Sequence, residues 1–200
     1  MRLVKKVSLE GTAHETTAFY DYDLRGNMTH SRVRYTGSGL PAAADRTRTY
    51  EYDGYGNRTR ESDTSGSPSR VTEKRFDALL HQFVIEESAI GDSITLTTGY
   101  EINYGSAFGS ISKKTDPNGN SVYFDYDAYG RLSRERADVE SGVATMTEYE
   151  YSTEFPLSGK TVQHTDVAPL TPGGGIIETR VYSDGMGRVL HMVRSATGEP

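Results

Sequence analysis

Aspartates at short, regular spacings are the side chains in this sequence that most resemble a site for chemistry. Asp21 and Asp23, followed by Gly26, begin like a twelve-residue calcium-binding loop, and residues 125–130 repeat that beginning. Such a loop needs a Glu at its twelfth position to bind the ion through both carboxylate oxygens, and Arg32 stands there. A calcium loop of this kind is therefore excluded. Alternating acids on a solvated strand face explain the spacing, and weak calcium binding is the alternative.

Other catalytic and cofactor-binding signatures each fail at a required position. The phosphate-loop ending Gly159–Thr161 needs a Gly five residues earlier, where Glu154 stands. A zinc-protease helix beginning at His14 would need a second His at the position of Ala18. The sequence has no Cys, which removes thiolate nucleophiles and Cys-ligated metal sites. We therefore predict a protein that is not an enzyme and that has no cofactor and no metal site.

Two asparagines begin formal acceptor sequences for N-linked glycans. Asn27 and Asn57 each start an Asn-x-Thr sequence. Both follow the Gly of a repeated phrase, so the repeat is sufficient to explain them. A bacterial source would make the signal void.

The composition excludes two classes of partner. The formal net charge is −6 and the Lys and Arg residues do not form a block, whereas a nucleic-acid-binding surface needs a concentrated basic patch. No run approaches the roughly 18 apolar residues of a membrane span, and this segment shows no secretory signal. Hydrophobic residues make up 34% of the chain, with 14 Tyr and 6 Phe. We expect a folded chain with a thin, Tyr-rich core.

One phrase recurs along the chain: an aromatic residue, an acid, two variable residues, a Gly, and then Asn or Arg. Its full copies, the last of them without the aromatic residue, contain Tyr22, Asp23, Gly26 and Asn27; Tyr52, Asp53, Gly56 and Asn57; Tyr126, Asp127, Gly130 and Arg131; and Asp184, Gly187 and Arg188. Weaker copies have their acid position at Asp77, Gly105 and Ser152. This recurrence, at a mean spacing of about 27 residues, indicates a tandem-repeat protein.

The chemistry of the phrase predicts a β-hairpin turn. The Asp side chain accepts a hydrogen bond from the backbone N–H two residues on, and the Gly supplies the positive φ that closes a three-residue loop. The hairpin tips are then residues 24–26, 54–56, 128–130 and 185–187. This closure sets each acid opposite the residue four positions later, which predicts the cross-strand pairs Asp23–Asn27, Asp53–Asn57, Asp127–Arg131 and Asp184–Arg188.

The segments that enter these turns alternate in polarity with a period of two, which is typical of β-strands. Tyr20 and Tyr22 share one face while Asp21 and Asp23 share the other, and residues 50–53, 124–127 and 148–151 repeat the alternation. Extending the hairpin register adds Met28, Arg58, Leu132 and Arg134 to the aromatic face, and Thr29, Thr59 and Ser133 to the acidic face. The pattern leaves open which face points inward. Residues 78–89 also fit a helix face, but strand patterns on both sides favour a strand.

These units resemble the YD repeats of RHS proteins. The join Thr115–Asn120, which includes Asp116 and Gly119, leads into Tyr123–Leu132, and this whole stretch is similar to the family's pattern. The segment Val181–His191 resembles part of the B components of insecticidal toxin complexes. The three weaker units depart from the pattern. The family's self-cleaving region, with its paired aspartates, has no counterpart in this sequence.

The resemblance implies an all-β fold in which tandem antiparallel hairpins form a curved sheet, a segment of a larger hollow β-shell. Residues 1–200 would then be a single repeat array, with the resemblance running from about 16 to 194, in a much larger secreted or cell-surface protein. In bacterial members the shell encloses a toxic C-terminal segment, and in animal relatives it serves adhesion. The implied partners are flanking repeats and an enclosed or tethered polypeptide.

Two functions therefore stay open. The first is a structural segment of a shell, acting in virulence, that encapsulates or presents a toxic or effector polypeptide. The second is a cell-surface binding module, because stripes of exposed Tyr and Arg suit glycans or a protein partner. A shell segment, unlike a binding module, is expected to bind no glycan tightly.

Overall fold

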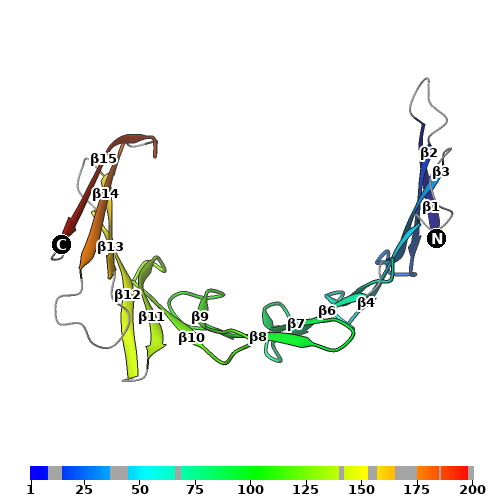
Figure 1. Ribbon diagram of the computed structural model, residues 1–200, viewed down its shortest axis with the longest axis horizontal. Helices are drawn as coiled ribbons and strands as arrows, with labels where there is room; N and C mark the ends of the chain where they lie inside the picture. Colours follow the sequence, from blue (N-terminus) through cyan, green and yellow to red (C-terminus); the bar gives the residue numbers. More distant parts are fainter. Residues whose placement is uncertain are drawn as a thin grey trace. The chain divides into compact units, whose positions relative to one another are not determined.

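The structure is a computed structural model of the chain. It describes residues 1–8, 15–36, 45–65, 69–139, 142–152, 157–164, 175–184 and 186–197. All regular secondary structure in these ranges is β-strand, and the strands follow one another along the chain (Figure 1). The described residues include no helix that is long and apolar enough to cross a membrane. The predicted all-β class of tandem hairpins is confirmed.

The chain divides into two compact units, Met1–Gly99 and Tyr100–Pro200. The first contains β1 (Arg2–Ser8), β2 (Glu15–Tyr22), β3 (Met28–Thr36), β4 (Arg46–Tyr52), β5 (Arg58–Asp63), β6 (Arg70–Phe76) and β7 (Val84–Ile90). Strand β8 (Thr95–Ile102) runs across the boundary. The second contains β9 (Ile111–Thr115), β10 (Ser121–Tyr126), β11 (Leu132–Val139), β12 (Gly142–Tyr151), β13 (Leu157–His164), β14 (Ile176–Ser183) and β15 (Val189–Thr197).

Each strand is hydrogen-bonded to the strands next to it in sequence, in the order β1 to β15. The repeated phrases lie at the turns of the hairpins β2–β3, β4–β5, β6–β7, β8–β9, β10–β11, β12–β13 and β14–β15. Antiparallel neighbours alternate in direction, so within each unit these turns lie at one end of the strands. The phrase that begins at Asp116 joins β9 to β10 and therefore lies at the other end.

A one-residue bulge follows the turn and changes which side chains share a face. In the hairpin β10–β11, Tyr126 is opposite Leu132, but Asp125 is opposite Arg134, so Ser133 is the extra residue. The same shift occurs in the hairpins β2–β3, β4–β5, β6–β7 and β14–β15. The prediction that Arg134 lies on the aromatic face is therefore wrong: it lies on the face of Asp125.

Neither unit has a filled hydrophobic core among the described residues. Their buried apolar residues are Ala18, Tyr50, Ala107 and Val162, and no large side chain is completely buried. The described strands contact only their neighbours in the sheet, so no second layer covers the sheet within either unit. The core is thin, as expected, but among the described residues Tyr50 is the one buried Tyr. Cross-strand pairs and turns must supply most of the stabilisation.

The segment that also fitted a helix face contains a turn and a strand. Residues 78–80 are in a turn, and β7 begins at Val84. The strand interpretation of this segment is confirmed.

Candidate functional site: acid-capped turns and the strand faces beside them

One carboxylate organises each full copy of the repeated turn, and Asp53 shows how. Its Oδ1 accepts hydrogen bonds from the backbone N–H groups of Tyr55 and Asn57, both at 2.9 Å. Its Oδ2 accepts one from Asn57 Nδ2 at 3.0 Å. The backbone closes through Gly56, whose N–H donates to the Asp53 carbonyl oxygen at 3.3 Å and whose φ is +92°. The result is a three-residue hairpin loop with a left-handed residue at its end.

The same acid cap forms at Asp23, Asp116, Asp127 and Asp184. In each, Oδ1 accepts from the backbone N–H groups two and four residues later at 2.8–2.9 Å. The turn glycines have positive φ in every case: Gly26 +89°, Gly119 +89°, Gly130 +76° and Gly187 +79°. Residues 24–26, 54–56 and 128–130 are hairpin tips. The fourth tip is described except for residue 185.

The residue four positions after the acid completes the cap with its side chain. Asn27 and Asn120 donate from Nδ2 to Oδ2 of their Asp at 3.0 Å. Arg131 and Arg188 donate from Nε at 2.7 Å and form ion pairs. Bonds between charged partners are shorter and stronger than neutral ones. The Asn and Arg variants of the phrase therefore make the same hydrogen bond to the Asp carboxylate, and the bond from Arg is the stronger of the two.

Hydrogen bonding holds the pKa of these carboxyls below its ordinary value. For Asp53 and Asp116 the largest cause is the bond from the Asn side chain. For Asp184 it is the backbone N–H of Arg188. Burial is the largest single influence on the pKa of the carboxyls of Asp23 and Asp127 and acts to raise it, but the hydrogen bonds together outweigh it. Each turn is thus built for the charged carboxylate.

Neighbouring turns of the first unit contact each other at their tips. Arg25 Nη1 donates to the carbonyl oxygen of Gly54 at 3.1 Å. The Tyr55 ring stacks on His81 of the next hairpin, with ring centroids 3.8 Å apart and planes 10° apart. Asn57 Nδ2 donates to the His81 carbonyl oxygen at 2.6 Å. Three consecutive hairpins are therefore tied together at their turns as well as along their strands.

The second unit ties its turns together through an arginine and a close backbone approach. The guanidinium of Arg131 lies 4.4 Å from the ring centroid of Tyr151, on the next hairpin, and 5.0 Å from that of Tyr129. A Cβ added at Gly130 would lie 3.7 Å from the carbonyl oxygen of Ser106 in the preceding loop. Arg131 therefore has two roles, because it closes its own turn and packs on the next strand pair.

The weaker copy at Asp77 keeps the acid cap without the glycine. Its carboxylate accepts hydrogen bonds from the backbone N–H groups of Leu80, Gln82 and Phe83 at 2.7–2.8 Å. The residue is only 3% exposed. The loop is longer than in the full copies, and the positive φ falls on His81, at 55°. Loop length compensates here for the missing glycine.

In the hairpin β8–β9 the capping residue is Asn103, not the expected position of Gly105. Asn103 Oδ1 accepts from the Gly105 N–H at 2.7 Å. The Asn103 carbonyl oxygen accepts from the N–H of Gly109, whose φ is +82°. An amide oxygen two residues earlier thus replaces the carboxylate.

In the hairpin β12–β13 the Ser152 N–H donates to the Ser158 carbonyl oxygen at 2.8 Å, and residues 153–156 lie outside the described ranges.

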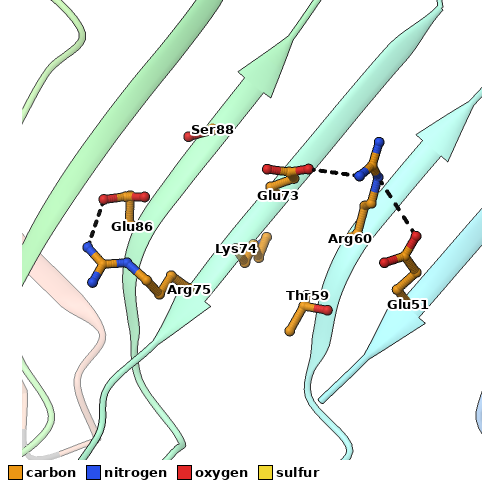
Figure 2. A pocket seen from close by; sticks show the side chains of 8 residues that line it. All are labelled: Glu51, Thr59, Arg60, Glu73, Lys74, Arg75, Glu86 and Ser88. Carbon is orange, nitrogen blue, oxygen red and sulfur yellow. Dashed lines mark hydrogen bonds and ion pairs between the residues drawn. The ribbon is translucent and has the colours of Figure 1, made fainter.

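The acids on one strand face of the first unit form a ladder of charge pairs. Figure 2 shows Arg60 between Glu51 and Glu73, at 3.9 and 3.1 Å, and Arg75 with Glu86 at 2.8 Å. These side chains line a shallow hollow across β4 to β7. All five are 39–69% exposed, so each pair contributes little on its own. The carboxylates are neutralised by neighbouring strands, which favours a structural role over acid–base chemistry.

The aspartates with calcium-like spacing do not converge on a common point. Asp21 Oδ1 pairs with Arg2 Nε at 2.7 Å across the strands β1 and β2, while Asp23 caps its own turn. Within the described ranges, no group of three or more His, Cys, Asp or Glu side chains could hold a metal ion. Within these ranges the structure therefore provides no site for the weak calcium binding that the sequence left open as an alternative.

The asparagines of the formal glycosylation sequences use their side-chain nitrogens inside the fold. Asn27 Nδ2 donates to Asp23 Oδ2, and Asn57 Nδ2 donates both to Asp53 Oδ2 and to the carbonyl oxygen of His81. A glycan would need this same nitrogen. The structural interpretation of the two sequences is the one that the geometry supports.

Large side chains are highly exposed at the hairpin tips, and among them Tyr55 also stacks on His81. Leu24 and Met186 are 106% and 82% exposed, and Tyr55 and Tyr129 are 68% and 77% exposed. Arg58 packs over the Tyr50 ring at 5.4 Å, which places it on the aromatic face as predicted. The tips, rather than the strand faces, therefore carry the side chains best placed to meet another molecule.

Comparison with known proteins finds related folds but no related sequence family. No protein-family model matches the chain, and no curated protein matches it. A chain in the structure of the Photorhabdus luminescens Tc holotoxin pore, which has a substitution in its TccC3 component, aligns with 90% of this chain at 13% identity and a TM-score of 0.55. A chain in the crystal structure of TcdB2–TccC3 aligns with 91% of this chain at 12% identity and a TM-score of 0.37.

The alignments cover 10% of the holotoxin chain and 14% of the TcdB2–TccC3 chain. This chain therefore spans about a tenth of the length of the toxin chain that it matches. It has the fold of that segment. In the sequence, residues 181–191 resemble part of a toxin-complex component. The structural comparison agrees, because the matching chain also comes from a toxin complex.

Proposed function

We propose that this chain is a non-catalytic wall segment of a YD/RHS-type β-shell, one that encloses or presents a toxic or effector polypeptide. The observation that carries the proposal is the one-layer sheet. Within each unit the described strands contact only sheet neighbours, and no large side chain is completely buried. A sheet that covers no core of its own is suited to form part of a wall. The fold shared with a segment of a toxin-complex chain supports the same reading.

The residues of the repeated phrase would then build the wall and take part in no reaction. The acids at Asp23, Asp53, Asp116, Asp127 and Asp184 cap turns, and the glycines three residues after each acid supply the positive φ. Tip contacts such as Tyr55 on His81 hold successive hairpins in register. In this proposal both units belong to one repeat array of a secreted or cell-surface protein, with flanking repeats and the enclosed polypeptide as partners.

Protease protection in the complete product of the gene tests the proposal. In a closed shell, segments outside the repeats should resist a protease that digests the denatured protein. Gly56→Val places a β-branched residue at a φ of +92° and should open the wall. Gly54→Val is the matched control, because Gly54 lies in the same turn with no positive φ and with open space around it. Digestion of the unmodified protein at the same rate as the Gly56→Val protein would contradict enclosure.

A binding module is the second candidate, and the exposed tips favour it. Leu24, Tyr55, Tyr129 and Met186 present large side chains to solvent at successive full turns. A glycan-array screen of the chain separates the two functions. Tight binding that is lost in Tyr55→Ala and Tyr129→Ala would favour the binding module, while a wall segment should bind no glycan tightly.

A further inference from the structure

One pair of strand positions in the second unit breaks the charge pattern of the sheet. Where two Lys, Arg, Asp or Glu residues stand directly opposite each other on described strands, their charges are otherwise opposite, as in Glu51 and Arg60. The exception among these described pairs is Lys160 on β13, which stands directly opposite Arg180 on β14. Like charges in this arrangement destabilise a strand pair. Such a local break in an otherwise consistent pattern is expected at a functional site.

The acids near this pair neutralise it only loosely. Lys160 Nζ lies 3.5 Å from Glu150 Oε1 and 3.4 Å from Glu178 Oε2. Arg180 Nη2 lies 3.5 Å from Glu178 Oε1, and the guanidinium also interacts with the Tyr182 hydroxyl. Close ion pairs are shorter, at about 2.7–2.9 Å. Because Arg has five N–H donors and Lys has three, both side chains can donate to a further anionic group.

An open hollow of about 310 Å³ lies over the two basic residues. Besides Lys160 and Arg180, its lining consists of Glu150, Tyr151, Ser152 and Ser158. Side chains alternate along a strand, so Tyr151 lies on the opposite face from Glu150, where its ring contacts Arg131. The described lining therefore offers charged groups and serine side chains to a ligand, and no apolar side chain.

We propose that this hollow binds an acidic sugar residue, such as a uronic acid, with its carboxylate between Lys160 and Arg180. The guanidinium presents a planar fork of donors that matches a carboxylate. The hydroxyls of Ser152 and Ser158 can donate to and accept from the sugar hydroxyls. A bound carboxylate would also reduce the repulsion between the two basic residues across the strands. The inference goes beyond the wall function and does not depend on it.

An acidic peptide fits this hollow less well than a sugar. Strands β13 and β14 each pair with a neighbour on both sides, so they offer no open backbone ladder to which a peptide strand could add. Peptide and protein contacts also take most of their affinity from buried aromatic or apolar anchors, and the described lining provides no pocket of that kind. A charged ligand rich in hydroxyl groups matches the lining better.

Ligand-observed NMR titrations of the full chain test the inference with three probes. Methyl glucuronide carries the ring and the carboxylate, methyl glucoside has the ring alone, and acetate has the carboxylate alone. The glucuronide should bind about tenfold more tightly than either of the others, because only it makes both sets of bonds. Arg180→Gln should weaken its binding by about tenfold. Arg75→Gln is the matched control, because Arg75 pairs with Glu86 at 2.8 Å in the other unit, and should leave binding unchanged.

Thermal melts of the same variants separate binding from a structural role. Arg180→Gln removes the like charge opposite Lys160, so its melting temperature should not fall below that of the unmodified chain. A lower melting temperature would show that Arg180 stabilises the sheet, and would overturn the inference.

The titrations could overturn the inference in three other ways. These are no binding of the glucuronide, equally tight binding of acetate or glucoside, and an equal loss of binding in Arg75→Gln and Arg180→Gln. The protease test of enclosure and the array test of Tyr55→Ala and Tyr129→Ala concern other parts of the chain. The earlier proposals and this inference can therefore fail separately.

Discussion

The carboxylate and the glycine of each repeated turn stabilise it in different ways. At Asp127 the carboxylate accepts the N–H of Tyr129, which is exposed, and the N–H of Arg131, which is half-buried. Water can replace the carboxylate at the exposed donor. At Gly130 the φ is +76°, a conformation that a β-branched side chain strongly resists. The backbone requirement is therefore harder to replace than the hydrogen-bond requirement.

This difference predicts the order of two substitutions in one turn. Gly130→Val should lower the free energy of unfolding by about 1–3 kcal/mol because it forces a β-branched residue into the left-handed region. Asp127→Ala should cost less, and Gly130→Asn, which tolerates positive φ, should cost least. Thermal melts of the three variants followed by circular dichroism measure the order. A larger loss in Asp127→Ala than in Gly130→Val would refute this account of the turn.

The lowered pKa of the capping carboxyls predicts a loss of stability in acid. Asp53 has a pKa below its ordinary value in the folded chain, and the unfolded value is about 3.9. Its contribution to stability is therefore complete above the unfolded pKa and is lost as the pH falls through the folded one. Asp53→Asn should unfold more easily than the unmodified chain at pH 7. Urea titrations across a pH series should show that difference shrinking below about pH 4, and a constant difference would contradict the assignment.

At the scale of the strand and hairpin, the Arg that follows the turn glycine contributes differently to stability in different repeats. Arg131 and Arg188 each donate from Nε to their Asp at 2.7 Å. Only Arg131 also lies over aromatic rings, at 4.4 and 5.0 Å, and Arg188 is 75% exposed. Arg131→Ala should therefore lower the free energy of unfolding by about 0.5–1 kcal/mol more than Arg188→Ala. Equal losses in parallel urea titrations would show that the rings add nothing.

The titration of the Tyr149 hydroxyl reports on the strand pair β11–β12 at high pH. Burial and the hydrogen bond from its hydroxyl to Glu135 Oε1, at 3.0 Å, raise the pKa of Tyr149 to about 12. The fold thus favours the neutral phenol, and this stabilisation is complete below the unfolded pKa of about 10 and is lost as the pH rises through the folded one. Tyr149→Phe should remove a late step near pH 12 from the phenolate absorbance titration. Tyr129→Phe, at an exposed tip, should leave that step in place.

The turns could be predicted from the sequence because their chemistry is local. Asp, Gly and the residue after Gly fall within five positions, so Asp53 and Gly56 sufficed to place the second hairpin tip. The bulge at Ser133 could not be predicted, because it depends on how two strands pair beyond the turn. Asn103 was missed because an amide oxygen can replace the acid when the loop is longer. Asp77 was identified as the acid of a weaker copy, but the length of its loop could not be predicted because the copy has no glycine to mark where the loop ends.

At the scale of the whole molecule, the absence of a covering layer over the described strands of each unit is the property on which the proposed function rests. The described strands pair in sequence order and contact only their neighbours, and the strands at the two ends of that order, β1 and β15, each have one free edge. This property could not be predicted from the alternation of Tyr and Asp, which suits a strand with either face covered. It follows from pairing, which within each unit places each described hairpin beside the next and none on top.

Free edges and a thin core predict that the chain is not a self-contained domain. Exposed edges template pairing with other chains, so the isolated chain should self-associate or be only marginally stable. Both end strands are basic, so their like charges oppose pairing at low salt. Association should therefore increase as added salt screens them.

Size-exclusion chromatography with light scattering, at several protein and salt concentrations, tests the claim that this chain is a wall segment most directly. A thermal melt of the same samples completes the measurement. A wall segment should show a mass that rises with protein and salt concentration, or a broad melt at low temperature. A sharply monomeric species that melts cooperatively under all conditions would contradict it, and would show that the sheet is a domain complete in itself.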